Sequence, residues 1–317
     1  MDSATIACIG VGNIGRAWAI SFARGGCDVR LYDNDSGNLE RSLKHIAASL
    51  RDLAEAGLID DPALIERRIT MVSDLKDAVS GCTYIQECIV ENLGVKQKLF
   101  EELDILCSPE TIIASSSSEF MASQLIARVK NEARVLVAHP FNPPYLIPLV
   151  EIAGHSATSD DVIMRTRVLL ESIGMSPVVV RKEIKAFLLN RLQAAVVAEA
   201  LHLVGEGYCS ATDLDRAMSE GLGLRWAFMG PFQTGHLNAS GGYRDYMRDD
   251  SYGGTFRRMI GDLDINSDWH YSLPEAISTE MEQKIPINEI ADGQRWRDKR
   301  LMALLKHKAS ERDYGGD

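Results

Sequence analysis

The sequence lacks a membrane-length apolar run, a basic tract and any internal repeat. A helix that spans a bilayer needs about 20 mostly apolar residues, so we expect no membrane segment. Binding to nucleic acid needs clustered Lys and Arg, whereas this chain carries a net charge of -11 without a basic stretch, so we expect no nucleic-acid partner. A small anionic substrate stays compatible with this charge, because one local arginine can outweigh a distant negative surface.

Closely spaced cysteine pairs are also missing. The six cysteines are Cys8, Cys27, Cys82, Cys88, Cys107 and Cys209. Without CxxC spacing they are typical of small buried hydrophobes in a reducing compartment, and we expect no metal site. Because residues 1–4 lead straight into an apolar strand, we also expect no signal or transit peptide and a cytoplasmic location.

The 317 residues are enough for two domains, each with its own core. Apolar runs typical of buried strands alternate with helical patterns as far as residues 177–180, which predicts an α/β fold with a Rossmann-type, doubly wound sheet. From Lys185 onward no convincing strand pattern occurs. We therefore predict a nucleotide-binding domain at residues 1–184 and an all-helical domain at residues 185–317. A mostly apolar helix at residues 186–207 is expected to be buried in a core or in a subunit interface.

A glycine motif separates the first predicted strand from the first predicted helix. It reads Gly10-Val11-Gly12-Asn13-Ile14-Gly15. Gly10 permits a tight turn, Gly12 lets the backbone approach a pyrophosphate, and Gly15 lets the helix pack closely on the strand. The helix N-terminus would face the phosphates, where its free N–H groups and dipole favour negative charge.

Asp33 ends the next predicted strand, residues 28–32, at about the spacing that dinucleotide sites show. Its carboxylate would accept hydrogen bonds from the ribose hydroxyls and would repel a 2′-phosphate. Arg30 precedes the strand end and is expected to point elsewhere. We therefore predict NAD rather than NADP as the cofactor.

His139 and Glu151 flank a segment that contains Pro143, Pro144 and Pro148 and cannot be helical. Apolar runs lie on both sides of it, so the chain is expected to form strand, rigid turn and strand, and the two side chains could meet. A carboxylate beside an imidazole holds one tautomer and stabilises the imidazolium, as proton transfer requires. The alternative is a core histidine bonded to a backbone carbonyl, with Glu151 solvated.

Other polar residues lie at predicted strand ends. Glu91 and Lys96 follow one strand, where open α/β sheets bind ligands, although a solvated lysine and a helix N-terminal acid are equally compatible with the pattern. The four hydroxyls of Ser115–Ser118 could line a site or form a plain loop or helix cap.

Two residues of the helical part also invite a functional interpretation. Asn190 lies in the apolar helix and must be either a satisfied core amide or a site residue, because an unpaired buried amide costs about 1–3 kcal/mol. Arg225 is the only cation of a glycine-punctuated aromatic stretch, residues 220–232. It suits bidentate carboxylate recognition, while the structural alternative is an arginine packed over Trp226.

Together these motifs make the chain resemble the 3-hydroxyacyl-CoA dehydrogenase family over nearly its whole length. The motifs are Gly10-x-Gly12-x-x-Gly15, Val90-Glu91-Asn92 with Lys96, Ser115–Ser118, His139-Pro-Phe-Asn142-Pro with Glu151, and Phe187-Leu-Leu-Asn190-Arg191. The resemblance implies that His139 is the general acid/base and Glu151 its orienting partner. It further implies that Ser118 and Asn190 contact the reacting oxygen, that Asn142 supports the pocket, and that Glu91 and Lys96 border the nicotinamide. It also implies a homodimer formed through the helical domain.

The segment around Arg225 bears on the substrate. The stretch before Gly230-Pro231 lacks an arginine in the acyl-CoA enzymes, but here it reads Gly223-Leu-Arg225-Trp-Ala-Phe. With the closing Arg295-Trp-Arg-Asp298 it resembles the lambda-crystallin branch, which implies L-gulonate 3-dehydrogenase activity.

We therefore expect NAD-dependent oxidation of a small free 3-hydroxy acid, whose carboxylate Arg225 would fix. The alternatives are an L-carnitine dehydrogenase, a diketo-acid reductase, a 3-hydroxyacyl-CoA enzyme, and a structural crystallin-like protein with a retained NAD site. The sequence leaves open whether residues 245–258 form a lid.

Overall fold

The structure is a computed structural model that describes residues 4–240, the single positions 243, 246, 248, 250, 255 and 259, and residues 286–310. The chain forms two compact units, one of residues 1–189 with 295–317 and the other of residues 190–294. Most of the last described helix, from residue 295 onward, therefore groups with the first unit, although the sequence assigned it to the helical domain. A domain boundary between residues 184 and 185 stays a prediction. Most of segment 245–258 lies outside the described residues.

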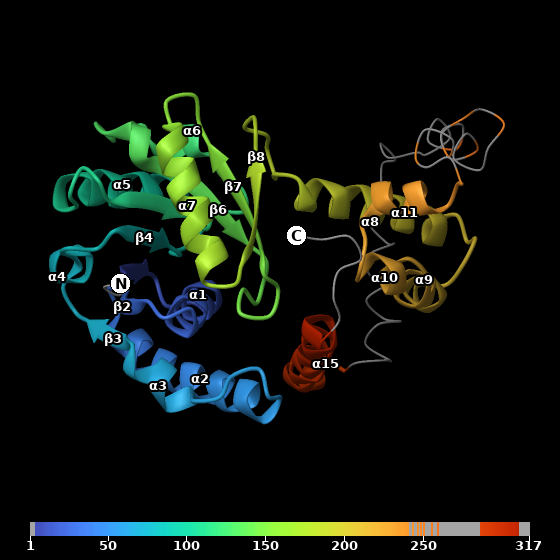
Figure 1. Cartoon of the computed structure of the whole chain (residues 1–317), viewed down its shortest axis with the longest axis horizontal. Helices are drawn as coiled ribbons and strands as arrows, with labels where there is room; N and C mark the ends of the chain where they lie inside the picture. The colour runs from blue at the N-terminus through green and yellow to red at the C-terminus, as the bar shows by residue number, and fades with distance from the viewer. Residues whose placement is uncertain are drawn as a thin grey trace. The chain divides into compact units, whose positions relative to one another are not determined.

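A sheet of eight strands forms the centre of the first unit, in the order β3-β2-β1-β4-β5-β6-β7-β8 among the described residues (Figure 1). The strands are β1 Thr5–Ile9, β2 Asp28–Tyr32, β3 Ile69–Val72, β4 Tyr84–Glu87, β5 Ile112–Ser115, β6 Val135–Pro140, β7 Leu149–Gly154 and β8 Ser176–Val180. Neighbouring strands run parallel except for the antiparallel pair β6 and β7. The strand order reverses between β1 and β4, as in a doubly wound sheet, which confirms the predicted Rossmann-type fold.

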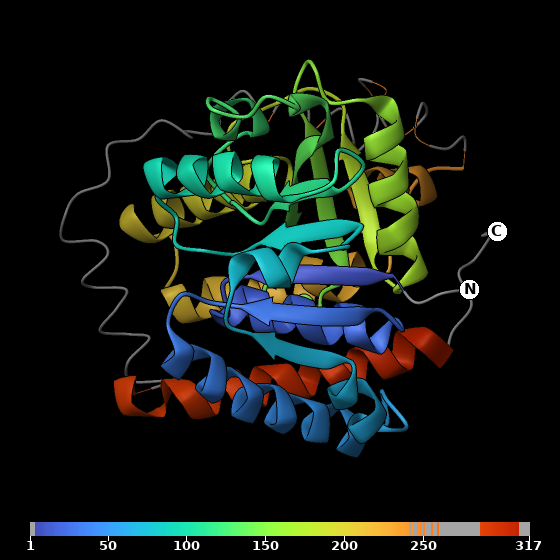
Figure 2. The same ribbon diagram turned by 90° about the vertical axis from the view of Figure 1, so that its left-hand side faces the viewer.

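Helices cover both faces of this sheet (Figure 2). They are α1 Asn13–Arg24, α2 Ser36–Glu55, α3 Pro62–Arg67, α4 Leu75–Val79, α5 Leu93–Leu106, α6 Ala122–Leu125 and α7 Asp160–Ser172. Successive side chains of a strand point to opposite faces. Ile6 and Cys8 accordingly belong to a core with α1, α2, α3 and α7, whereas Ala7 and Ile9 belong to a core with α4, α5 and α6. A sheet buried on both faces explains why its strands read as continuous apolar runs.

In the second unit the described secondary structure is helical, as the sequence predicted. The elements are α8 Leu189–Gly205, α9 Ala211–Ala217, a π-helical turn Met218–Leu222, α10 Gly223–Trp226 and α11 Pro231–Leu237. After the 3₁₀ turn Ile287–Glu289, α15 Ile290–Ser310 places Met302 in the core of the first unit. None of the α8 residues is buried, and Leu192 is 61% exposed. The expectation that this helix lies in a core is therefore wrong, and its place in a subunit interface stays a prediction.

Two expectations from composition can be compared with the structure. All six cysteines are free, and Cys8, Cys27, Cys82 and Cys107 are buried, so these four are the small hydrophobes that the sequence predicted. Within the described residues, no helix combines the length and the apolar character that crossing a bilayer requires.

Candidate active site

The glycine loop connects β1 to α1, and its three glycines meet different surroundings. Gly10 has a φ of 94°, and a Cβ there would lie 2.7 Å from the Cys88 carbonyl oxygen. A Cβ at Gly15 would lie 1.9 Å from the Gly10 oxygen, whereas a Cβ at Gly12 would have no described atom within 4 Å. Gly12 is also the N-cap of α1 and has no side chain to cap the first-turn N–H groups of Asn13 and Ile14. The loop therefore offers open space and free donors at Gly12, which suits a pyrophosphate.

Beside this loop lies a cleft of about 520 Å³, lined among others by residues 9–12, 32–34 and 88–90. Asp33 stands in its wall, and its Oδ2 accepts a hydrogen bond from the Val11 N–H at 3.0 Å. Arg30 donates instead to the carbonyl oxygens of Asp77 and Ser80, at 2.8 and 2.5 Å, so its predicted orientation away from Asp33 is confirmed. Among the described residues that line the cleft there is a carboxylate at Asp33 and no arginine, as expected for NAD rather than NADP.

Lys96 of α5 is buried between two carboxylates, one from Glu87 at the carboxyl end of β4 and one from Glu91 in the segment between β4 and α5. Its Nζ lies 2.7 Å from Glu87 Oε1 and 3.2 Å from Glu91 Oε2. Burial alone would lower the pKa of Lys96, but the two carboxylates outweigh it and raise this pKa above its ordinary value. The alternative of a solvated lysine is therefore wrong. The sequence analysis missed Glu87, because an acid at the end of a short apolar strand shows its partner only in the folded chain.

The serine run turns out to have two parts. Ser115 donates to Glu87 at 2.5 Å, Ser116 accepts from Trp18 and Gln86, and Ser117 donates to Glu91. Ser118 is exposed, and its hydroxyl makes no hydrogen bond to the described residues. The first three hydroxyls therefore build the strand end, and only the fourth is left for a ligand.

His139 and Glu151 are direct partners in the antiparallel pairing of β6 with β7. The His139 Nδ1 lies 2.9 Å from Glu151 Oε2, and both side chains are buried. The predicted meeting of the two is confirmed, and the alternative with a solvated Glu151 is wrong. Since the carboxylate occupies Nδ1, His139 has Nε2 left, and this atom makes no hydrogen bond to the described residues.

The other oxygen of Glu151 faces the start of α8. Glu151 Oε1 accepts hydrogen bonds from the backbone N–H groups of Leu188 and Leu189, at 2.8 and 2.9 Å. Burial would raise the pKa of the Glu151 carboxyl, but the bonds from His139, Leu189 and Leu188 outweigh it and lower this pKa below its ordinary value. Glu151 is therefore an ionised acceptor, which obliges Nδ1 of His139 to carry the proton.

Two aromatic rings enclose the imidazole, and the sequence analysis assigned a role to neither. Phe187 stacks on it, with ring centroids 5.1 Å apart and planes inclined by 29°. Phe141 approaches edge-on at 5.0 Å and 63°. Phe141 lies within the quoted His139 motif and Phe187 opens the Asn190 motif, so the sequence contained a signal for both.

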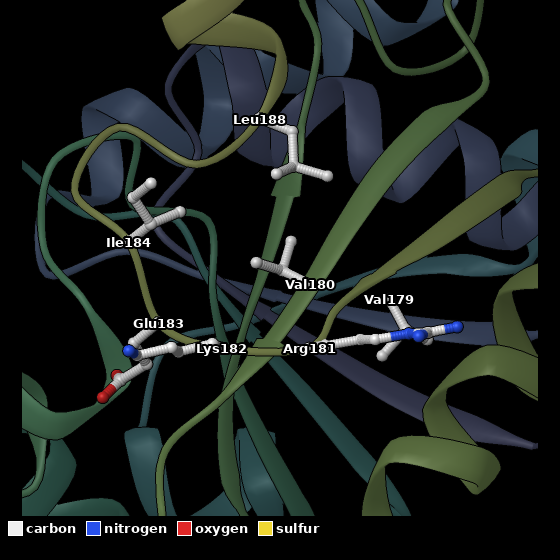
Figure 3. A pocket seen from close by; sticks show the side chains of 7 residues that line it. All are labelled: Val179, Val180, Arg181, Lys182, Glu183, Ile184 and Leu188. Carbon is white, nitrogen blue, oxygen red and sulfur yellow. The ribbon is translucent and has the colours of Figure 1, made fainter.

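A second cavity, of about 600 Å³, lies where β8 continues toward α8 (Figure 3). The apolar side chains of Val180, Ile184 and Leu188 line it, and the charged chains of Arg181 and Lys182 extend in opposite directions (Figure 3). Leu188 thus lines this cavity with its side chain while its N–H supports Glu151. The cavity and the dyad therefore share one short segment of chain.

The remaining predicted site residues are exposed or belong to the second unit. Asn142 is exposed in the turn after β6. Asn190 in α8 and the exposed Arg225 in α10 lie in the second unit, and Arg225 forms no salt bridge with the described residues. The roles of these three residues stay predictions. No group of three or more His, Cys, Asp or Glu side chains within the described ranges is placed to hold a metal ion.

Comparison with known proteins places this arrangement in a family. Residues 5–184 match the NAD-binding domain of 3-hydroxyacyl-CoA dehydrogenase, and residues 187–261 match its C-terminal domain. The lambda-crystallin homolog of Homo sapiens is 38% identical over 317 residues, 98% of either chain. The L-carnitine dehydrogenase of Oceanobacillus iheyensis is 39% identical over 232 residues, 73% of this chain and 75% of that protein.

Among solved structures, FHMPC 5-dehydrogenase, an NAD⁺-dependent dismutase, has a TM-score of 0.83 at 27% identity and covers 98% of this chain and 100% of its own. The matched domains include the glycine loop and the His139–Glu151 pair, and the open space at Gly12 suits the cofactor that the first domain is named for. The chain therefore belongs to the 3-hydroxyacyl-CoA dehydrogenase family, and its cofactor is NAD.

Proposed function

We propose that the protein oxidises the C3 hydroxyl of a small free 3-hydroxy acid, with L-gulonate as the substrate. The observation that carries this proposal is the buried His139–Glu151 pair, which leaves Nε2 of His139 without a partner among the described residues. His139 is the penultimate residue of β6, at the carboxyl end of the parallel strands, where sheets of this kind bind ligands.

In the proposed reaction, His139 takes the hydroxyl proton at Nε2, and Glu151 stabilises the imidazolium that forms. Bound NAD supplies the acceptor for the hydride from C3. Ser118 holds the substrate oxygen from the segment that follows β5, the strand next to β6, since Ser115 of β5 pairs with Val137 of β6 in the register. Asn190 contacts the same oxygen and Asn142 supports the pocket. The product is a 3-oxo acid, which from L-gulonate would be 3-dehydro-L-gulonate.

Glycine-loop residues Gly10–Gly15 and Asp33 hold the adenosine diphosphate part of NAD. Glu91 borders the nicotinamide end, where its side chain is one-third exposed. Lys96 and Ser117 hold this carboxylate in place. A fixed carboxylate at that point orients the cofactor without an entropic cost at the moment of reaction.

The identity of the substrate rests on Arg225. A guanidinium binds a free carboxylate with two parallel hydrogen bonds, and a thioester offers no such partner. Replacing Arg225 by Met should raise KM for the acid roughly 10- to 100-fold, because a hydrogen bond to a charged group contributes about 1.5–3 kcal/mol. A variant with unchanged KM would contradict the role of Arg225.

L-Carnitine is a second candidate substrate, favoured by the similarity to the carnitine dehydrogenase. It also carries a free carboxylate, so Arg225 alone does not separate it from L-gulonate. A panel of L-gulonate, L-carnitine, L-3-hydroxybutyrate and a 3-hydroxyacyl-CoA, followed by NADH absorbance, separates the candidates. Preference for L-gulonate supports the proposal, preference for the thioester contradicts the role of Arg225, and NADH binding without turnover supports a structural protein.

A homodimer is the quaternary structure that we propose. The exposed apolar residues of α8, such as Leu192 and Val197, support it, because unpaired apolar surface on a helix is typical of an interface. Sedimentation of the wild type should give a dimer, and Leu192→Glu should shift it to the monomer. A monomeric wild type would contradict the proposal.

A further inference from the structure

The covalent bond to Cβ and the hydrogen bond from Nδ1 to Glu151 hold two neighbouring atoms of the imidazole. Small changes of the side-chain torsions can still tilt the ring, and because Nε2 lies farthest from both anchors, a tilt displaces Nε2 most. To accept the hydroxyl proton while the hydride leaves C3, Nε2 of His139 must stay close to one position, because a displacement of about 1 Å can lower the rate about 10²-fold. Contacts with the ring itself limit that tilt, and two are present: Phe141 approaches edge-on and Phe187 stacks on one face.

Of these two contacts, the stacked one, from Phe187, bears directly on the plane of the ring. Its ring is 1% exposed and stacks on the imidazole at 5.1 Å and 29°. Val135 and Val137 belong to the same core cluster as Phe187 and precede His139 on one face of β6. The phenyl ring is therefore part of a packed core and stacks on one face of the imidazole.

The backbone at this point is in a conformation that L-residues rarely adopt. Ala186 and Phe187 have φ values of 64° and 51°. Two consecutive non-glycine residues in the left-handed region persist only where the surroundings hold them, and such outliers gather at functional sites. Here the turn directs Phe187 into the core, and it leaves the next two N–H groups, of Leu188 and Leu189, bonded to Glu151.

We propose that residues 186–189 form a clip around the dyad in which Phe187 is a positioning residue that sets the plane of the His139 ring. One short segment thus holds both members of the pair, His139 through an aromatic face and Glu151 through two backbone donors. The kinetic consequence rests on the proposed function, whereas the restraint on the ring does not.

The kinetic test compares Phe187→Leu with Phe100→Leu. Phe100 is a fully buried residue of α5 in the same core cluster, without a ring contact to His139. Phe187→Leu should lower kcat about 10- to 100-fold, with KM and NADH affinity unchanged and the isotope effect of C3-deuterated substrate at its full value.

Phe100→Leu should lower the melting temperature as much as Phe187→Leu does and leave kcat unchanged. Phe187→Tyr, which keeps the ring, should retain most of the wild-type activity. Equal losses of kcat in the two leucine variants would overturn the proposal.

A second measurement does not depend on turnover. The proton that His139 Nδ1 shares with Glu151 should give a sharp, exchange-protected resonance at low field in the wild type and in Phe100→Leu. In Phe187→Leu this resonance should broaden or exchange more rapidly, because one face of the ring then lacks its stacking partner. An unchanged resonance would refute the clip even if the enzyme proved inactive on every acid in the panel, and that inactivity would by itself refute only the proposed function.

Discussion

Replacing Glu151 by glutamine removes one charge and one accepting oxygen from a carboxylate that accepts three hydrogen bonds. One carboxylate oxygen accepts the hydrogen bond from His139, and the other accepts hydrogen bonds from the N–H groups of Leu188 and Leu189. An amide has a single oxygen, so it cannot serve both sides. If the amide nitrogen faced the backbone, two buried donors would be left unpaired, at about 1–3 kcal/mol each.

The amide oxygen should therefore face Leu188 and Leu189, and the NH₂ group should face His139. Nδ1 must then accept a hydrogen bond, which moves the imidazole proton to Nε2 and removes the base. In the serine-protease triad the corresponding loss of the correct tautomer costs about 10⁴-fold in kcat. We expect Glu151→Gln to lower kcat by about 10²–10⁴-fold, while NADH affinity stays unchanged.

The assay is steady-state turnover together with NADH titration by fluorescence. A matched control is Glu171→Gln, because Glu171 is an exposed residue of α7 whose side chain pairs with Arg167 alone among the described residues. That variant should keep wild-type turnover. A Glu151→Gln enzyme with kcat within about threefold of the wild type would refute the tautomer argument.

Three further predictions concern the cofactor loop and stability. Gly12→Ala should weaken NADH binding without lowering stability, because the added Cβ enters open space where the cofactor binds. Gly15→Ala should unfold the protein, because the added Cβ meets the Gly10 oxygen. Equal melting temperatures of the two variants would contradict this prediction. Lys96→Met should lower the free energy of unfolding in urea by about 3–5 kcal/mol, since it leaves Glu87 buried without its cation. The control is Lys98→Met, which removes an exposed lysine of the same helix, and a smaller loss of unfolding free energy in Lys96→Met than in this control would contradict the prediction. Asp104 has a lowered pKa in the folded protein, because bonds from Arg134 and two backbone groups outweigh burial. Its contribution to stability should therefore be complete above the unfolded pKa of about 3.9 and be lost as pH falls through the folded pKa, and Asp104→Asn should weaken this acid dependence.

The parts of the site that the sequence predicts are those set by local rules. Prolines exclude a helix between His139 and Glu151, and two apolar runs around a turn then place these residues opposite each other. Gly10 and Gly15 were predictable in the same way, because their backbone positions leave no room for a side chain.

The parts that the sequence did not predict depend on tertiary contacts. Nothing in the run of four serines separates Ser118 from the three that bond to Glu87, Gln86 and Glu91. The helix expected from residue 186 begins at Leu189, because Ala186 and Phe187 adopt left-handed backbone without a glycine to signal it. Propensity rules assign such residues to a helix, and only the contact with the dyad shows why they leave it.

The most direct test of the central claim is the rate of NADH formation by His139→Ala, measured beside NADH affinity, with the preferred acid of the panel. Removing the imidazole should lower turnover by about 10²-fold or more and leave NADH binding intact, because His139 moves a proton and does not hold the cofactor. Turnover at the wild-type rate, or an equal loss of NADH affinity, would contradict the assignment of His139 as the base.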